Sequence, residues 1–268
     1  MSTMSLPVAP VRRLRRAWLM QITLVPLVLL GVWEVWAVLA GDSHAPAPTR
    51  VIESFIELVA QGGLIGATVE SLGRVVSGFA VALVLGVVLG ILMGSNRWVR
   101  NLLDPIVESF RPVAPMALLP LAILWLGAGT PAAVSIVAYA AFFPLLINTV
   151  HGVSRVDRKL VLAARTMGVP RWRILTKVVL PASLPAVLLG SRLAMGVAWT
   201  AIVAAELGVG AKSGGGGSGG IGAMMFVFYA YNVDLNAIVV CMIVVGVVAL
   251  LIDRLFRFAE HRLMPWRT

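Results

Sequence analysis

The chain has 268 residues, of which 59% are hydrophobic and 13% are charged, whereas soluble domains average about 45–50% and about 25%. A soluble fold could not bury so much apolar surface, and the mean hydropathy of +0.94 indicates an integral membrane protein. The net charge of +10 then indicates loops retained on one side of a membrane, so we expect no nucleic acid partner. One cysteine and three scattered histidines exclude a disulfide framework and predict no metal site.

Six segments approach the length of about 20 apolar residues that a membrane-spanning helix needs. The sequence therefore predicts an all-α, polytopic membrane protein with spans at residues 18–39, 72–93, 113–127, 132–150, 185–207 and 237–252. Prolines interrupt the third span, and Arg192 and Glu206 lie within the fifth. Such interruptions are tolerated beside other helices or a cavity, so these two spans are expected to face protein or water.

Six spans place both termini on the same side of the membrane. If the N-terminus is inside, the inner segments hold all of the 22 basic residues except Arg50, Arg74 and Lys212. Cytoplasmic loops carry an excess of Lys and Arg. We therefore expect a basic cytoplasmic tail at residues 1–17, a membrane domain at 18–258 and a cytoplasmic tail at 259–268.

The inner segment 154–181, between the fourth and fifth spans, is far longer than the about 2–8 residues that usually join helices in bundles. Its apolar residues recur at helical spacing, Ser154 or Asp157 can cap a first helix, and residues 168–170 separate it from a second. Pro181 is expected to end that second helix before the membrane. Such a helical hairpin would lie on anionic lipid or dock on a cytoplasmic partner.

Within this hairpin, Leu162-Ala163-Ala164 is followed by Gly168, then by Val178 and by Leu180-Pro181. This spacing resembles the EAA loop of ATP-binding-cassette (ABC) importer permeases, whose pattern is Glu-Ala-Ala, Gly, Ile, Leu-Pro. Leu162 stands where that family has its glutamate, so a salt bridge from that position does not carry over. Small alanines permit close helix approach, and Gly168 permits a tight turn. The resemblance implies that the residues contacting the ATPase are Leu162, Ala163, Ala164, Gly168, Val169, Pro170, Arg171, Val178, Leu180 and Pro181.

Further blocks are similar to the nitrate, sulfonate and taurine group of these permeases: residues 103–115, 119–127, 143–149, 198–206 and 262–266. The resemblance implies the type I importer fold, a homodimer in the bacterial inner membrane, two cytoplasmic ATPase subunits and an extracytoplasmic binding protein. It implies a small anionic solute, with taurine or another sulfonate favoured and nitrate or bicarbonate possible. It also implies no enzyme activity and no cofactor in this chain, because ATP and magnesium bind to the partner ATPase.

Polar or aromatic side chains along the spans are candidates for a translocation pathway or gate: Arg111, Trp125, Asn148, Trp199, Thr200 and Glu206. Glu206 could instead be an interfacial carboxylate, Arg111 an ordinary inner-surface arginine, and Asn148, Trp199 and Thr200 helix-packing residues. The glycine-rich stretch 208–222 is expected to be a mobile outer loop that binds nothing specifically.

Two other classes of function stay open on residue patterns alone. A self-sufficient secondary carrier would have an internal repeat and a coupling carboxylate in mid-membrane, and neither is evident in the sequence. A membrane enzyme would need a catalytic constellation, and no predicted span carries one. Co-purification of an ATPase would favour the importer, whereas gradient-driven uptake by this chain alone would favour the carrier.

Overall fold

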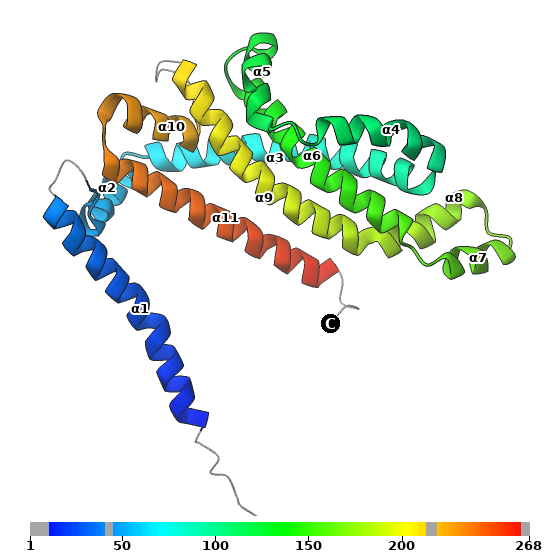
Figure 1. Ribbon diagram of the computed structural model, residues 1–268, viewed down its shortest axis with the longest axis horizontal. Coiled ribbons are helices and arrows are strands. Elements are labelled where there is room, and N and C mark those ends of the chain that lie inside the picture. The colour runs from blue at the N-terminus through cyan, green and yellow to red at the C-terminus, as the bar shows by residue number, and fades with distance from the viewer. Residues whose placement is uncertain (1–10, 41–44, 213–218, 264–268) are drawn as a thin grey trace, which may run out of the picture.

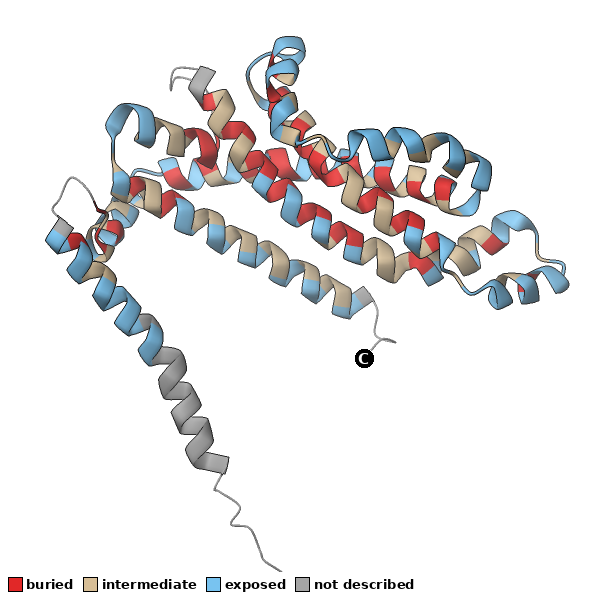
Figure 2. Cartoon of the chain, viewed as in Figure 1, coloured by how far each residue is buried: buried red, intermediate tan, exposed pale blue. Residues whose placement is uncertain are grey.

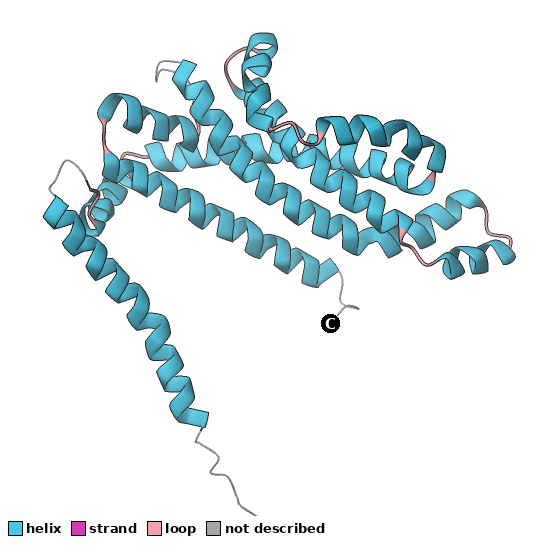
Figure 3. Ribbon diagram, viewed as in Figure 1, coloured by secondary structure: helices cyan, strands magenta, loops and turns pink. Residues whose placement is uncertain are grey.

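The computed structural model describes residues 11–40, 45–212 and 219–263, and these residues form helices and loops with no strand (Figure 3). For 11–23, 26, 40, 211–212 and 263, only the backbone is described. The helices, in chain order, are α1 Val11–Ala40, α2 Pro48–Ala60, α3 Gly63–Ser95, α4 Arg97–Phe110, η1 Pro115–Leu118, α5 Leu119–Leu126, α6 Thr130–Ser154, α7 Arg158–Thr166, α8 Arg171–Ile174, η2 Leu175–Val179, α9 Leu180–Lys212, α10 Ile221–Val227, η3 Phe228–Asn232 and α11 Leu235–Leu263. The all-α class is thus confirmed.

Within the described residues, four helices are long and apolar enough to cross a membrane: residues 63–95, 130–154, 171–210 and 235–262. Each of them contains one of the predicted spans. A fifth candidate joins α4 to the η1–α5 segment, which is bent from α4 by 84°. The chain is therefore a multi-pass membrane protein with four to five recognisable spans, where the sequence predicted six.

The predicted third span, 113–127, is built as two short helices after a sharp turn. Asn96 caps α4 by accepting a hydrogen bond from the Trp98 amide at 2.9 Å. At the other end of α4, the Tyr139 hydroxyl of α6 donates to the carbonyl of Phe110 at 2.6 Å. Pro115 then opens η1, because the first position of a helix does not need the amide proton that proline lacks. The prolines noted in the sequence thus mark a bend in the chain.

The predicted first span, 18–39, lies in α1, which extends away from the other helices (Figure 1). Of the side chains described in α1, most are apolar and exposed. Ala37 is buried against Ala45 and Ala47, and the Glu34 carboxylate accepts hydrogen bonds from the amide and hydroxyl of Thr49 at 3.2 and 2.8 Å. Glu34 therefore holds the start of α2 against α1.

The core lies where α3, α6 and α9 face one another (Figure 2). Glycines on α3 face α6 so closely that a side chain would collide. A Cβ atom at Gly78 would lie 2.7 Å from the Cβ of Val137, and one at Gly86 would lie 2.9 Å from the Cβ of Leu145. Because lipid tails supply no hydrophobic drive between helices, such close backbone contact stabilises membrane bundles through dispersion.

The helix that begins at Arg171 runs without interruption for 40 residues to Gly210. The prediction that Pro181 ends a helix is therefore wrong. The turn before Pro181, η2, is a π-helix, in which each amide bonds to the carbonyl five residues earlier. This wider turn accommodates the amide proton that Pro181 lacks. The second helix of the predicted inner segment and the fifth predicted span are therefore one continuous helix.

The non-helical part of the glycine-rich stretch 208–222 is shorter than the predicted loop. The first residues of the stretch, 208–212, belong to α9, and its last two, Ile221 and Gly222, begin α10. Gly210 packs against Ala223, where an added Cβ atom would lie 3.0 Å from the Ala223 Cα. Residues 213–218 lie outside the described part of the chain, so the prediction of a mobile loop applies to them alone.

Candidate functional site

The predicted coupling segment forms the helical hairpin α7–α8 at one end of the bundle (Figure 1). Asp157 caps α7 by accepting a hydrogen bond from the Lys159 amide at 2.8 Å. Gly168 turns the chain with a φ of +70°, a left-handed conformation that favours glycine. Among the predicted contact residues, Ala164 is buried, whereas Leu162, Ala163, Gly168, Pro170, Arg171 and Pro181 are exposed and Val169, Val178 and Leu180 are half-buried.

The hairpin presents large apolar side chains to its surroundings. Leu160 and Leu162 are 52% and 48% exposed, and Met167 and Trp172 are 74% and 71% exposed. Basic residues accompany them: Arg158, Lys159, Arg165, Arg171, Arg173 and Lys177. A surface of exposed apolar side chains with a polar rim is typical of a site for protein association.

Two cavities open beside α6, and the predicted residues Arg111 and Asn148 line them. The larger, of about 420 Å³, is lined by Arg111, Tyr139 and Asn148 together with apolar side chains. The second, of about 330 Å³, is lined by Asn148, His151 and Arg155. Asn148 therefore lies between two hollows that contain an arginine each, and its amide nitrogen donates to the Pro144 carbonyl at 2.8 Å.

A third hollow of about 160 Å³ lies between α4 and α6 and is lined by Arg100, Asp104, Glu108, Arg111 and His151. It shares Arg111 with the larger cavity and His151 with the second. Asn148 and His151 are three residues apart and share one face of α6, and Arg155 follows four residues later, directly after the end of this helix. The sequence interpretation missed His151 and Arg155, although this helical spacing was readable.

The remaining predicted pathway residues lie elsewhere. Trp199 is 2% exposed within the core, and its ring nitrogen donates to the Val245 carbonyl of α11 at 3.1 Å. This geometry supports the helix-packing alternative for Trp199. The Thr200 hydroxyl donates to the Val197 carbonyl of its own helix at 2.9 Å. Trp125 is 75% exposed at the end of α5.

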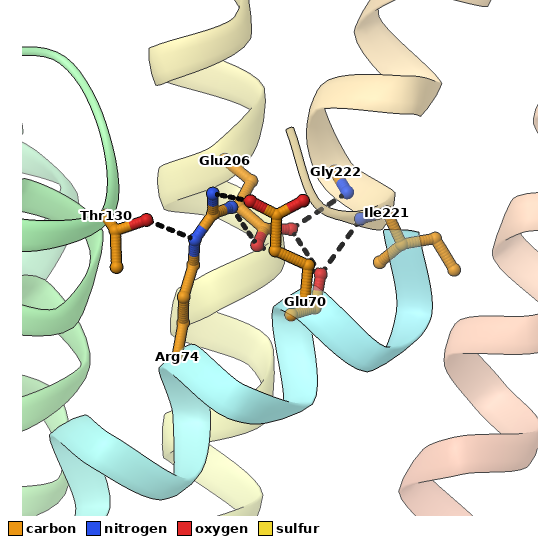
Figure 4. Close-up of polar contacts among 7 residues, drawn as sticks. Glu70, Arg74, Thr130, Glu206, Ile221 and Gly222 are labelled. Atoms are coloured by element: carbon orange, nitrogen blue, oxygen red, sulfur yellow. Dashed lines mark hydrogen bonds and ion pairs between the residues drawn. The ribbon is translucent and has the colours of Figure 1, made fainter. Parts of the chain in front are cut away.

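Glu206 is the centre of a buried polar cluster at the opposite end of the bundle from the α7–α8 hairpin (Figures 1 and 4). Its side chain is 1% exposed, and its carboxylate lies 2.8 Å from the Arg74 guanidinium, which is 5% exposed. The Ser71 hydroxyl approaches the two carboxylate oxygens at 2.9 and 2.7 Å. The interfacial alternative for Glu206 is therefore wrong, because α9 continues to Lys212 and α3 and α10 cover the carboxylate.

The cluster joins four helices. Arg74 of α3 also contacts Glu70 at 2.5 Å and donates to the Thr130 hydroxyl at the start of α6 at 3.1 Å. Glu206 accepts a hydrogen bond from the Gly222 amide at 3.1 Å, and the Ser71 hydroxyl accepts one from the Ile221 amide at 2.9 Å. The first amides of α10, which no helical carbonyl can pair, are thus satisfied by α3 and α9.

The sequence interpretation counted Arg74 with the outer segments, and the structure shows it inside the 33-residue helix α3, where it is buried. Ser71 and Arg74 were missed as partners of Glu206. A charged residue within an apolar helix is itself a signal of a polar partner, and this signal was present at Arg74.

Residues 82–265 match the family described as binding-protein-dependent transport system inner membrane components. The chain belongs to this family. As members work with a binding protein and with a separate ATPase that binds ATP, this permease is the non-catalytic inner-membrane component of an ABC transporter. The resemblance drawn from the coupling segment is thereby confirmed at the level of the family.

Named relatives cover almost the whole permease. It is 35% identical to the putative aliphatic sulfonates transport permease of Bacillus subtilis, over 95% of this chain and 90% of the relative. It is 34% identical to the taurine transport system permease of Escherichia coli, over 95% and 94%. It is also 34% identical to the nitrate import permease of Synechocystis, over 89% and 86%.

The fold of the permease is also that of a solved transporter. An inward-facing structure of the MetNI methionine ABC transporter superimposes with a TM-score of 0.60 at 20% identity, covering 72% of this chain and 93% of that chain. At this identity the likeness concerns the fold alone. It confirms the architecture of an ABC importer permease.

Proposed function

We propose that the permease imports a small anionic solute, taken from an extracytoplasmic binding protein, by alternating access. The observation that carries this proposal is the row of hollows beside α6, in which Arg111 lines a cavity of about 420 Å³ and Arg155 lines one of about 330 Å³. Guanidinium groups are permanently charged and pair well with oxyanions. A cavity of this size admits an organic sulfonate as readily as nitrate.

Taurine or another sulfonate is the favoured solute, with nitrate and bicarbonate as competitors. The blocks Arg111-Pro112-Val113-Ala114-Pro115 and Pro265-Trp266 support the sulfonate group. Identity to the named relatives does not separate these solutes, because it is 35%, 34% and 34% for the sulfonate, taurine and nitrate proteins. The binding protein selects the solute, and the permease needs only a cavity that attracts and releases an anion.

The proposed assembly is a homodimer with two ATPase subunits on the α7–α8 hairpin and both termini in the cytoplasm. The hairpin's exposed Met167 and Trp172 supply apolar contacts, and its basic rim favours an acidic surface on the ATPase. Closure of the ATPase pair would move the hairpins, and the two permeases would switch between inward-open and outward-open packings.

The proposal is tested by uptake into liposomes that contain the permease and its ATPase, with the binding protein outside. Taurine, butanesulfonate, nitrate and bicarbonate are compared. We expect ATP-dependent uptake of a sulfonate and no uptake without the ATPase. Uptake driven by a proton gradient in the absence of the ATPase would instead support a secondary carrier.

Arg111→Gln is expected to lower the rate of anion uptake by about three- to fivefold, a loss typical of one partly exposed charge. The ATPase activity stimulated by the binding protein should stay, because Arg111 lies outside the coupling hairpin. Arg97→Gln, at the exposed start of the same helix and outside the three cavities, is the control. Equal uptake by both variants would contradict a role for Arg111 in the pathway.

A further inference from the structure

The polar cluster around Glu206 and the coupling hairpin are joined by one helix. From Arg171 to Gly210 the chain is helical for 40 residues, which at 1.5 Å per residue spans about 60 Å. One end of this helix continues the hairpin, and the other carries Glu206. A displacement of the hairpin therefore reaches Glu206 through continuous helical backbone.

This long helix packs tightly along its length. An added Cβ atom at Gly190 would lie 2.7 Å from the Cβ of Asn148, and one at Gly152 would lie 2.6 Å from the Cβ of Ala186. Contacts this close leave little space to absorb movement, since close-packed interiors are hardly compressible. We therefore expect the helix and its neighbour α6 to move as one body.

At its far end, the long helix and α3 together hold α10, each through one hydrogen bond from two successive amides of α10. Gly222 donates to Glu206 at 3.1 Å, and Ile221 donates to Ser71 at 2.9 Å. A Cβ atom at Gly220 would overlap Glu206 Oε1 and Ser71 Oγ. The backbone of α10 therefore rests directly on these polar groups (Figure 4), and their position fixes the position of α10.

A buried ion pair is costly, and apolar side chains of similar volume often stabilise a protein equally well. The contribution of Arg74 and Glu206 is instead that their directional hydrogen bonds fix how the helices are arranged. The carboxylate accepts hydrogen bonds from Arg74, Ser71 and Gly222, and the guanidinium is itself oriented by Glu70 and Thr130. Such a set permits one arrangement of α3, α9 and α10, which apolar packing would not enforce.

Building on the proposed function, we propose that Glu206 is a positioning residue of the transport cycle: together with Ser71 and Arg74 of α3 it fastens α10 to the long helix and to α3, so that movement of the α7–α8 hairpin also moves α10. Glu206 contacts no solute in this role. It acts through α10, the element that joins the glycine-rich segment to η3 and α11.

The test measures deuterium uptake of α10 in the complex of the permease with its ATPase, in lipid nanodiscs. In the wild type, trapping with ATP and vanadate should change the uptake of peptides covering residues 221–227. In Glu206→Gln, resting exchange of these peptides should be about tenfold faster, because a charge-assisted contact is weakened. The response to ATP and vanadate should be lost, although the ATPase subunits remain bound.

Glu70→Gln is the matched control, because Glu70 contacts Arg74 but is 34% exposed and its described contacts do not include α10. It should keep the wild-type response. If Glu206→Gln does not assemble, Ser71→Ala decides, because it removes the contact to Ile221 and keeps the ion pair. A wild-type response in either of the two variants that contact α10, or its loss in Glu70→Gln, overturns the inference.

The same preparation separates this inference from the proposed function. A wild-type complex that takes up taurine or another tested anion, yet shows no change of exchange at α10 on trapping, contradicts only the role of Glu206. A wild-type complex that takes up none of the tested anions contradicts the proposed function.

Discussion

Gly168 sets the direction of the α7–α8 hairpin, the proposed site of contact with the ATPase. Its φ of +70° lies in the left-handed region, and its amide donates to the Arg165 carbonyl at 3.0 Å while the Val169 amide donates to the Ala164 carbonyl at 3.1 Å. An added side chain would meet nothing within 4 Å. A substitution at Gly168 therefore acts through the backbone, with no steric effect on the spans.

Gly168→Pro is expected to leave the protein inserted in the membrane and to abolish ATPase stimulation by the binding protein. Proline fixes φ near about −65°, so the hairpin cannot close in its present shape. Gly168→Asn should retain stimulation, since asparagine tolerates the left-handed region. Measurement of ATPase activity in the reconstituted complex decides, and normal stimulation in Gly168→Pro would contradict the role of the turn.

The residues of the site that could be predicted are those whose signal is local. Asp157 and Gly168 serve a cap and a turn within a few residues of themselves, and both were identified from the sequence. The partnership of Arg74 and Glu206 joins positions 132 residues apart. No local pattern pairs them, because only the packing of α3 on α9 brings them together.

At the scale of elements, α3 and α6 are held at a short distance by small residues. Gly78 faces Val137 so closely that a Cβ atom would lie 2.7 Å from its Cβ and 2.8 Å from the Val134 carbonyl. Gly73, five residues earlier on the same helix, meets nothing within 4 Å. Substitution of Gly78 and of Gly73 by alanine therefore compares a tightly packed position with an open one on the same helix.

Gly78→Ala is expected to lower the free energy of unfolding by about 1–3 kcal/mol, because the added methyl group forces the two helices apart. Gly73→Ala should be neutral or slightly stabilising, since alanine favours helix by about 0.8–1.0 kcal/mol over glycine. Thermal unfolding in detergent, followed by circular dichroism, compares the two. Equal melting temperatures would contradict the importance of this contact.

Hydropathy located the four helices that are long and apolar enough to cross a membrane, because lipid-facing surfaces must be apolar along their whole length. It did not reveal that α8, η2 and α9 form one helix, since Pro181 is normally a terminating signal and the π-turn that accommodates it has no recognisable pattern. Hydropathy also did not reveal the bend of 84° between α4 and the η1–α5 segment, because hydropathy depends on composition alone and does not determine the angle between two helices.

At the scale of the whole molecule, the distribution of charge predicts the orientation. The α7–α8 hairpin should face the cytoplasm and η3 the outside. In a Cys241→Ala background, Thr166→Cys should react with a membrane-impermeant maleimide only in inside-out vesicles, and Asn232→Cys only in right-side-out vesicles. Both positions are exposed. Reaction of both cysteines from the same side would contradict the predicted topology.

The exposed Met167 and Trp172, which are 74% and 71% accessible, have a consequence for biogenesis. If the ATPase docks on this hairpin as proposed, a permease copy without an ATPase subunit would keep these side chains in water, where chaperones and membrane proteases recognise apolar surface. An excess of the membrane subunit would therefore be degraded. We therefore expect the amount of permease in the membrane to follow the amount of its ATPase subunit.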